Sequence, residues 1–238
     1  MIVANERTVC GYTLLGFGHV TSDTDLDALG ALAYLAGKKA EEAGRTPVFA
    51  EIGSWVGESA VTMYAHCPAH EVKIHCIDTW RGSDHDHTGN MARTMCNGKS
   101  IHDIFEHNVQ QVNRAAFFDH SGRGHDIVAG FKDRSLDLVF IDAEHTYDAV
   151  AEDIRDWAPK LREDGILCGH DFNTNGFPGT TDAVMDYGLE NDMVILCKRG
   201  TTVWVATKPG SEHYTQIMDV LKKHSVSFLD RRDHEATN

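Results

Sequence analysis

The segment TPVFAEIGSWVGESA, residues 46–60, constrains the fold of this chain more than any other part of the sequence. Its apolar run at 47–52 is short and is bounded by turn residues, as in a strand that is buried on both faces of a parallel sheet. Gly53 and Gly57 follow, four residues apart, where this strand must turn into a helix expected over 56–65. Glycine adopts positive φ and allows a ligand to approach the backbone closely. Ser54 is a candidate N-cap for the helix.

The turn has the pattern Glu-x-Gly-x-x-x-Gly, which differs from the Gly-x-Gly-x-x-Gly fingerprint of dinucleotide-binding proteins. It resembles motif I of the class I S-adenosylmethionine (SAM) methyltransferases. The resemblance implies that the loop lies against the amino-acid and ribose parts of SAM. It implies cofactor contacts for Glu51, Gly53, Ser54, Gly57 and Ser59. Two other interpretations stay open here: a nucleotide-binding Rossmann domain, and a strand–turn–helix without a ligand.

The composition limits the classes of partner. The chain has 238 residues, enough for a single α/β domain, and a net charge of −14. Such an acidic balance argues against nucleic acid or an anionic membrane as the main partner. None of the six cysteines forms a Cys-x-x-Cys motif, so we expect reduced thiols in a cytoplasmic protein. No signal peptide or membrane span is expected, and the sequence leaves a homo-oligomer open.

Strand and helix patterns alternate along the chain. Seven strands are expected, at 47–52, 71–77, 115–118, 136–141, 166–168, 193–198 and 202–206. Helices are expected at about 24–43, 56–65, 101–112, 126–131 and 146–161. A loop at 176–181 is expected to lead into a further helix that ends at about residue 189, and another helix is expected after Gly210. Residues 162–165 are expected to cap the helix at 146–161, and Gly16-Phe17-Gly18 to form a turn.

The predicted fold is α/β, with a Rossmann-like, doubly wound, mostly parallel seven-stranded sheet. The terminal antiparallel hairpin distinguishes the class I methyltransferase fold, which the sequence resembles, from the plain six-stranded Rossmann domain. We expect one SAM-dependent methyltransferase domain over 1–238, with an N-terminal helical extension at 1–44. The irregular, His-rich segment 81–100 is expected to form a lid over the substrate. Metal binding by residues 84–87 is disfavoured, because four consecutive residues cannot all converge on one ion.

Acidic residues follow several of the predicted strands. In an open parallel sheet, ligands bind beyond the carboxyl ends of the strands, so we expect these groups to share one site. Asp78 could accept hydrogen bonds from both ribose hydroxyls, with Thr79 and Trp80 beside it. By resemblance to the family, Ser121, which follows the third strand, lies near the adenine. Asp142 is expected to contact the cofactor as well.

The run FIDAEHTYDAVAEDIRDWAPKLREDGILCGHDF, residues 140–172, resembles the macrocin and mycinamicin sugar O-methyltransferases and the cephalosporin hydroxylase-like proteins. More distantly it resembles catechol O-methyltransferase. The resemblance implies that Asp142, His170 and Asp171 hold a divalent cation and that His145 is the catalytic base. His170 departs from the usual pair of acidic or amide residues and favours softer ions than Mg²⁺.

The function that the sequence predicts is SAM-dependent methyl transfer to a hydroxyl of a small molecule, such as a sugar or a natural product. A divalent cation, Mg²⁺ or another, is a second cofactor that the sequence leaves open. Two alternatives remain. The first is a methyltransferase-fold module that binds SAM for regulation without catalysis, and the second is an NAD-dependent oxidoreductase, which the glycine spacing disfavours.

Overall fold

The computed structural model describes residues 5–16, 21–83 and 100–222. Most of the expected lid, with residues 84–87, lies outside these ranges. The chain begins with a hairpin of β1 (Asn5–Val9) and β2 (Tyr12–Gly16). The strands of the main sheet and the helices that pack on it follow in the order α1 (Asp23–Glu42), β3 (Val48–Ile52), α2 (Glu58–His66), β4 (Lys73–Asp78), α4 (Ile101–Gln110), β5 (Phe117–Ser121), α5 (Gly124–Ile127), β6 (Leu136–Ile141), α6 (Tyr147–Trp157), β7 (Leu161–Gly169), α7 (Pro178–Glu190), β8 (Val194–Cys197), β9 (Trp204–Thr207) and α8 (Glu212–Lys222).

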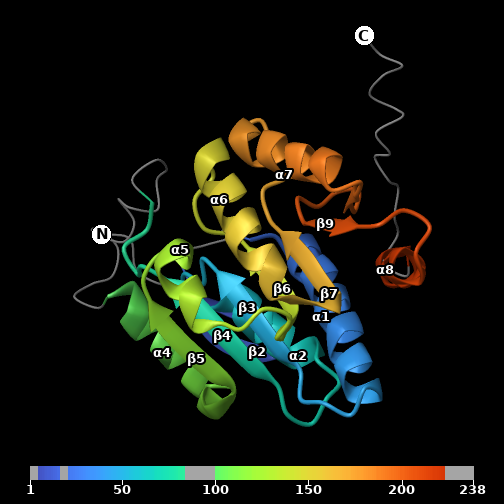
Figure 1. Ribbon diagram of the computed structural model, residues 1–238. Coiled ribbons are helices and arrows are strands. Elements are labelled where there is room, and N and C mark those ends of the chain that lie inside the picture. The colour runs from blue at the N-terminus through green and yellow to red at the C-terminus, as the bar shows by residue number, and fades with distance from the viewer. Residues whose placement is uncertain (1–4, 17–20, 84–99, 223–238) are drawn as a thin grey trace.

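The main sheet has seven strands in the order β5-β4-β3-β6-β7-β9-β8. The first five strands are parallel, and β9 pairs antiparallel with both β7 and β8 (Figure 1). The predicted α/β fold with its terminal antiparallel hairpin is therefore confirmed. Because all five parallel strands end at the same edge, the groups that follow them are brought together there.

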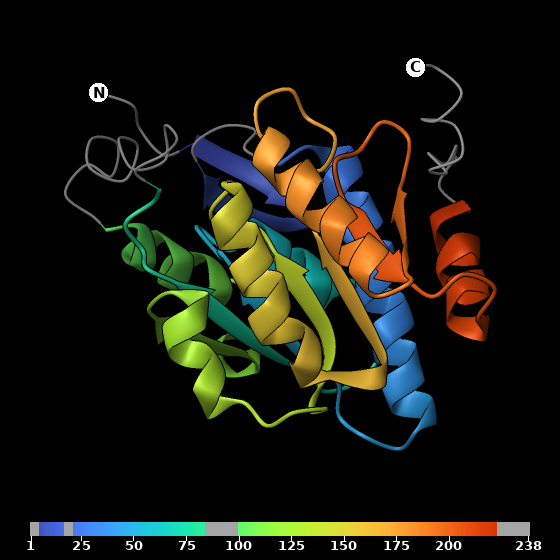
Figure 2. The same cartoon turned by 45° about the horizontal axis from the view of Figure 1, so that its top comes forward.

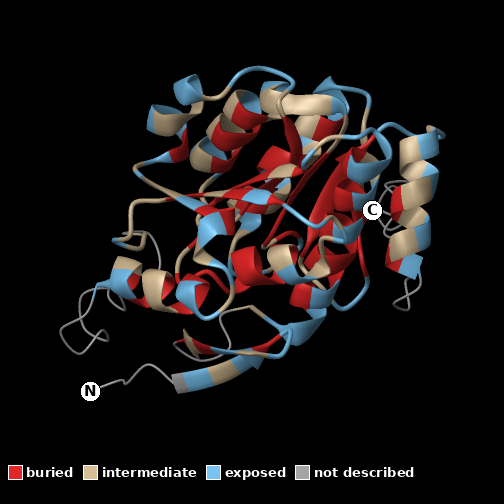
Figure 3. Cartoon of the chain, turned by 90° about the horizontal axis from the view of Figure 1, so that it is seen from below, coloured by how far each residue is buried: buried red, intermediate tan, exposed pale blue. Residues whose placement is uncertain are grey.

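Helices cover both faces of this sheet. Buried side chains of α1, α2, α4 and α8 pack on one face, and those of α6 and α7 pack on the other, on the viewer's side in Figure 1. The strands between them are buried, shown in red in Figure 3, and the outer sides of the helices are exposed. Within the described residues, no helix has both the length and the apolar character needed to cross a bilayer.

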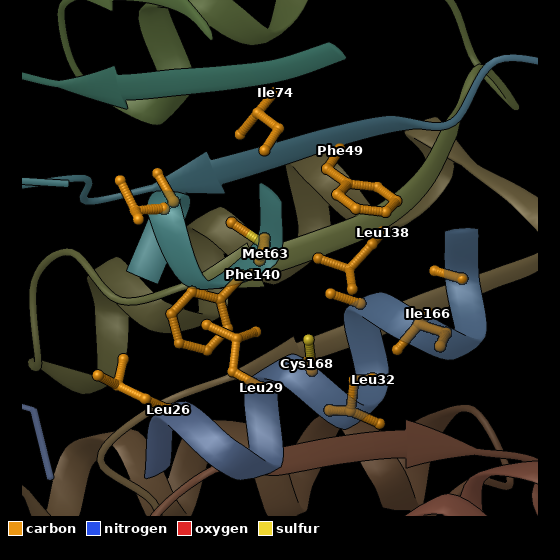
Figure 4. Close-up of a cluster of buried hydrophobic side chains, with 14 of the residues drawn as sticks. Leu26, Leu29, Leu32, Phe49, Met63, Ile74, Leu138, Phe140, Ile166 and Cys168 are labelled. Atoms are coloured by element: carbon orange, nitrogen blue, oxygen red, sulfur yellow. The ribbon is translucent and has the colours of Figure 1, made fainter. Parts of the chain in front are cut away.

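Helix α1 shows how the sequence pattern produces this packing. Leu26, Leu29 and Leu32 recur every three residues and form one buried stripe. Figure 4 shows the stripe against the sheet, where it meets Phe140 of β6 and Ile166 of β7. The helix begins after Ser22, whose hydroxyl accepts a hydrogen bond from the Asp25 N–H and so caps the helix.

The N-terminal hairpin was not predicted, since the sequence suggested only a helical extension. It lies at the upper edge of the sheet in Figure 2, beside the beginning of α1. Asn108 of α4 fixes it, because its amide accepts from the Leu15 N–H at 2.7 Å and donates to the Leu15 carbonyl at 2.8 Å. The same amide nitrogen donates to the Val56 carbonyl in the glycine loop. One buried side chain thus joins the hairpin to the candidate site.

Two other predictions differ from the structure. Strand β5 begins at Phe117 instead of residue 115, because a 3-10 turn at Arg114–Ala116 precedes it. Residues 162–165 do not cap a helix but belong to β7, where the pairing passes from Leu136↔Leu161 to Leu138↔Ile166. The extra residues form a bulge, which periodicity does not reveal. The expected strand at 136–141 and the final hairpin are found as predicted.

Candidate functional site

The loop between β3 and α2 is shaped by close contacts between backbones. Gly53 has φ 94°, and a Cβ atom there would lie 2.1 Å from the Asp142 carbonyl oxygen. Gly57 has φ 86°, and a Cβ atom there would lie 2.9 Å from the Phe105 ring. Both glycines are therefore required by the protein's own packing. The predicted N-cap role of Ser54 is wrong: α2 begins later, at Glu58, and Gly57 is its N-cap residue.

A cavity of about 1070 Å³ lies at the carboxyl ends of the parallel strands. It extends from the segment after β7, past β6, β3 and β4, to the segment after β5. Most of the predicted site residues line it: Gly53, Ser54, Gly57, Ser59, Asp78, Thr79, Ser121, Asp142, His145, His170 and Asp171. Its size suits a drug-sized ligand with room for a second small molecule.

Glu51 and Trp80 were also predicted to contact the cofactor, but neither is among the residues that line this cavity. Glu51 is fully buried on the face of the sheet that α1 and α2 cover, beneath the glycine loop. Burial raises its pKa to about 8, and the nearby hydroxyls of Ser59 and Ser54 offset this only in part. The Trp80 ring packs on Phe105 at 4.8 Å instead of facing the cavity.

Asp78 holds two strained loops in place. Its carboxylate accepts the Trp55 N–H at 2.7 Å and the Trp80 N–H at 2.6 Å, one on each oxygen. Both tryptophans have positive φ, 47° and 58°, which is unfavourable for residues other than glycine. Burial raises the pKa of Asp78, and the two backbone hydrogen bonds act against that shift. Each carboxylate oxygen of Asp78 keeps a lone pair that can accept a hydrogen bond from a ligand. On the neighbouring strand β5, Ser121 is the residue that pairs with Asp78.

At the other end of the cavity, four side chains from the segments that follow β6 and β7 converge. His145 Nε2 lies 2.9 Å from Asp171 Oδ2, and the His145 ring stacks on Phe177 with centroids 4.1 Å apart. His170 Nδ1 lies 3.5 Å from Asp142 Oδ1 and 3.4 Å from Asp171 Oδ2. These residues are separated by up to 29 positions, but they meet because β6 and β7 are neighbouring parallel strands.

The ionisation of this cluster follows from burial and charge. Burial raises the pKa of Asp142, and His170 reduces that shift. Burial also opposes the charged form of His170, but the carboxylates around it outweigh burial and raise its pKa. For Asp171, hydrogen bonds from His145 and His170 overcome the effect of burial and hold its pKa well below the ordinary range. The cluster therefore carries opposite charges in direct contact.

Asp25 is a member of this site that the sequence did not reveal. It lies in the first turn of α1, 117 residues before Asp142, and is 6% exposed. Its Oδ1 accepts the Thr202 N–H at 2.7 Å, and its Oδ2 lies 3.5 Å from His170 Nε2. Its position three residues after Ser22 indicates only helix capping, so no signal in the sequence links it to His170.

Comparison with known proteins agrees with this geometry. Residues 50–172 match a family described as a methyltransferase domain, over about half of the chain. The chain belongs to this methyltransferase family. The resemblance of motif I to class I methyltransferases is thereby confirmed, while the macrocin and mycinamicin group stays a prediction. The family match covers the glycine loop, Asp78 and the whole cluster from Asp142 to Asp171.

Solved structures of methyltransferases share the fold. The O-methyltransferase NovP aligns with a TM-score of 0.56 at 15% identity, over 76% of this chain and 80% of that one. An O-methyltransferase from Bacillus cereus in complex with S-adenosylhomocysteine (SAH) aligns with 0.57 at 14%, over 80% and 84%. CalS11, a TDP-rhamnose 3'-O-methyltransferase of calicheamicin biosynthesis, aligns with 0.53 at 15%, over 79% and 80%. At these identities the likeness shows the fold alone.

A curated relative by sequence is the uncharacterized protein y4gI of Sinorhizobium fredii strain NBRC 101917 / NGR234. It is 27% identical over 124 residues, which are 51% of this chain and 12% of that protein. The chain therefore matches only about an eighth of that relative's length.

Proposed function

We propose that this protein transfers the methyl group of SAM to a hydroxyl group of a small molecule. The observation that carries the proposal is the His145–Asp171 contact beside Asp142 at one end of a cavity whose middle is formed by the glycine loop and Asp78. A methyl donor bound along the loop would face a proton acceptor at that end. The family supports methyl transfer, and the oxygen acceptor is our inference from the histidine base.

His145 is the residue that we assign as the base. Its Nδ1, the ring nitrogen that does not contact Asp171, would take the proton of the acceptor hydroxyl as the methyl carbon–sulfur bond breaks and the methyl carbon–oxygen bond forms, while Nε2–H donates to Asp171. The products are a methyl ether, SAH and a proton on His145. Asp171 would stabilise the resulting imidazolium through the 2.9 Å contact, while Phe177 fixes the plane of the ring. Asp171 itself has φ 58°, a strained conformation of the kind that clusters at functional sites.

The same cluster fits a divalent cation. One oxygen of Asp142, one ring nitrogen of His170 and one oxygen of Asp171 all lie within 4.8 Å of one another. Carboxylate oxygens suit Mg²⁺ or Mn²⁺, whereas the imidazole nitrogen shifts the preference towards Mn²⁺ and later transition metals. When bound, the ion would act as a Lewis acid for the acceptor oxygen. We therefore propose Mn²⁺ in preference to Mg²⁺.

The acceptor is a small hydroxylated molecule, such as a sugar or a natural product. The cavity has room for it beside the cofactor, and acidic side chains surround the proposed base, among them Glu144, whose carboxylate accepts the Ser83 hydroxyl at 2.6 Å. These charges disfavour an anionic acceptor. CalS11, which shares the fold, carries a sugar substrate in its name and supports this class of acceptor.

Calorimetry with SAH tests the cofactor, and transfer of a labelled methyl group to a panel of hydroxylated compounds tests the reaction. We expect SAH binding and turnover that His145→Ala lowers about 100-fold or more. No SAH binding at millimolar concentration would overturn the proposal. Binding without turnover on any acceptor, with His145→Ala unchanged, would favour a regulatory binding module. Activity that EDTA does not change would remove the cation and leave the transferase.

A further inference from the structure

The mechanism above makes no use of Asp153, a buried acid in the same cavity. Asp153 lies on α6, is 8% exposed and is one of the cavity-lining residues. It forms no hydrogen bond or ion pair within residues 5–16, 21–83 and 100–222, whereas its neighbour Asp156 binds His125 at 2.7 Å. A buried carboxyl group without a partner is costly, so a polar partner from a ligand would stabilise it.

Gly124, Ile52 and Trp157 lie around the Asp153 carboxyl group, and the charged side chains of Arg123, His125 and Glu152 line the same cavity. A Cβ atom on Gly124 would lie 2.5 Å from Asp153 Oδ1, and 3.0 Å from both Ile52 Cγ2 and Trp157 Nε1. The glycine therefore leaves just enough room for the acid beside the end of β3. An aliphatic side chain, an indole and a peptide backbone around one carboxyl group suit a flat ring with polar atoms on its edge.

Burial is also the main reason that Asp153 holds a proton near neutral pH. It raises the pKa of Asp153 to about 7, with help from the negative charges of Glu152 and Asp156 on its own helix. His125 and Arg123, from the segment at the start of α5, oppose that shift. A neutral carboxyl group offers one donor and one acceptor side by side, whereas a carboxylate offers acceptors only.

Asp153 lies at the end of the cavity that is far from the proposed base, where the adenine of the cofactor would bind. The proposed base lies after β6 and β7, and Gly124, which Asp153 contacts, follows β5 at the far edge of the parallel strands. Four strand spacings separate β5 from β7, or about 19 Å. With the sulfonium near His145 and the ribose at Asp78 in between, the adenine ring extends towards Gly124 and Asp153.

We propose that Asp153 recognises the adenine of the cofactor as a neutral acid. Its O–H donates to a ring nitrogen, and its carbonyl oxygen accepts from the neighbouring 6-amino group. The inference rests on the proposed SAM-binding function and adds a specificity-determining residue on α6. It predicts that the cavity selects for the 6-amino group, because loss of that donor leaves a buried acceptor without a partner.

The test measures SAH affinity by calorimetry at pH 6.5 for the full chain and three variants. Asp153→Asn keeps one donor and one acceptor, so its dissociation constant should stay within about threefold of the unmodified protein. Asp153→Ala should bind SAH about 10- to 100-fold more weakly. Asp148→Asn, an exposed charge change on the same helix, is the matched control and should leave binding unchanged.

A second probe is an SAH analogue with hydrogen in place of the 6-amino group. The unmodified protein should bind it about tenfold more weakly than SAH, and Asp153→Ala should bind both equally. SAH affinity should also fall as the pH rises above about 7 in the unmodified protein, because Asp153 then ionises, but not in Asp153→Asn. Equal SAH affinity for Asp153→Ala and the unmodified protein would overturn the inference and keep the methyltransferase. Absence of SAH binding by the unmodified protein would overturn the proposed function itself.

Discussion

Replacing Gly53 with alanine tests whether the contact between the glycine loop and the Asp142 segment stabilises the fold. Gly53 has φ 94°, and the new Cβ atom would lie 2.1 Å from the Asp142 carbonyl oxygen and 2.6 Å from Ala143 Cα. Both are backbone atoms, so no side-chain rotation relieves the overlap. The two segments must separate by about 1 Å, which strains the hydrogen bond from Asp142 N–H to the Ile52 carbonyl at 2.8 Å.

The cost has two parts that a matched control separates. Alanine at positive φ costs about 1–2 kcal/mol, and the overlap adds about 2–4 kcal/mol through overpacking and one weakened backbone hydrogen bond. Gly11 has φ 85° but no atom within 4 Å of its Cβ position, so Gly11→Ala carries only the first part. We expect Gly53→Ala to lose about 2–4 kcal/mol more than Gly11→Ala.

Urea unfolding followed by circular dichroism measures this difference. With an m-value of about 2–3 kcal/mol/M, the midpoint of Gly53→Ala should lie about 1 M below that of Gly11→Ala, provided that both slopes match the unmodified protein. Equal midpoints for the two variants would refute the reasoning, because they would show that the Asp142 segment yields without cost.

Three further predictions concern other buried groups. The folded protein keeps Glu51 protonated up to about pH 8, so its free energy of unfolding should fall by up to roughly 1.4 kcal/mol per pH unit between about pH 4.5 and 8. Glu51→Gln should remove that slope when unfolding is measured across this pH range. An unchanged slope in the variant would contradict the prediction. Asp171→Asn should lower kcat about tenfold or more while SAH affinity stays constant, since Asp171 positions His145; equal losses in both would instead indicate a structural role. Asn108→Ala should lower the free energy of unfolding by about 2–4 kcal/mol, because the backbone N–H and carbonyl of Leu15 lose their hydrogen-bond partner. The Leu15 amide should then exchange its hydrogen faster, and retained protection would contradict this role of Asn108.

The candidate site was predictable where function depends on strand ends. Asp78, Asp142 and Asp171 lie at or directly after strands that the apolar runs identify, and parallel strands bring such positions to one edge. The roles of Glu51 and Trp80 were not predictable in the same way. Glu51 lies one residue before Ile52 in a strand that is buried on both faces, so the pattern of apolar residues does not show which helix layer each side chain meets.

The sequence by itself determined the succession of strands and helices from α1 onward, the sharp turn after β3 and the acidic ends of the strands, because these depend on short-range patterns of apolar residues, glycine and polar residues. Only the tertiary structure decided which distant groups meet. It brought Asp25 of α1 to His170 and placed Asp153 of α6 beside Gly124. Such contacts depend on how helices pack across a sheet and on which polar atoms lose water, and neither is encoded in a local window of residues.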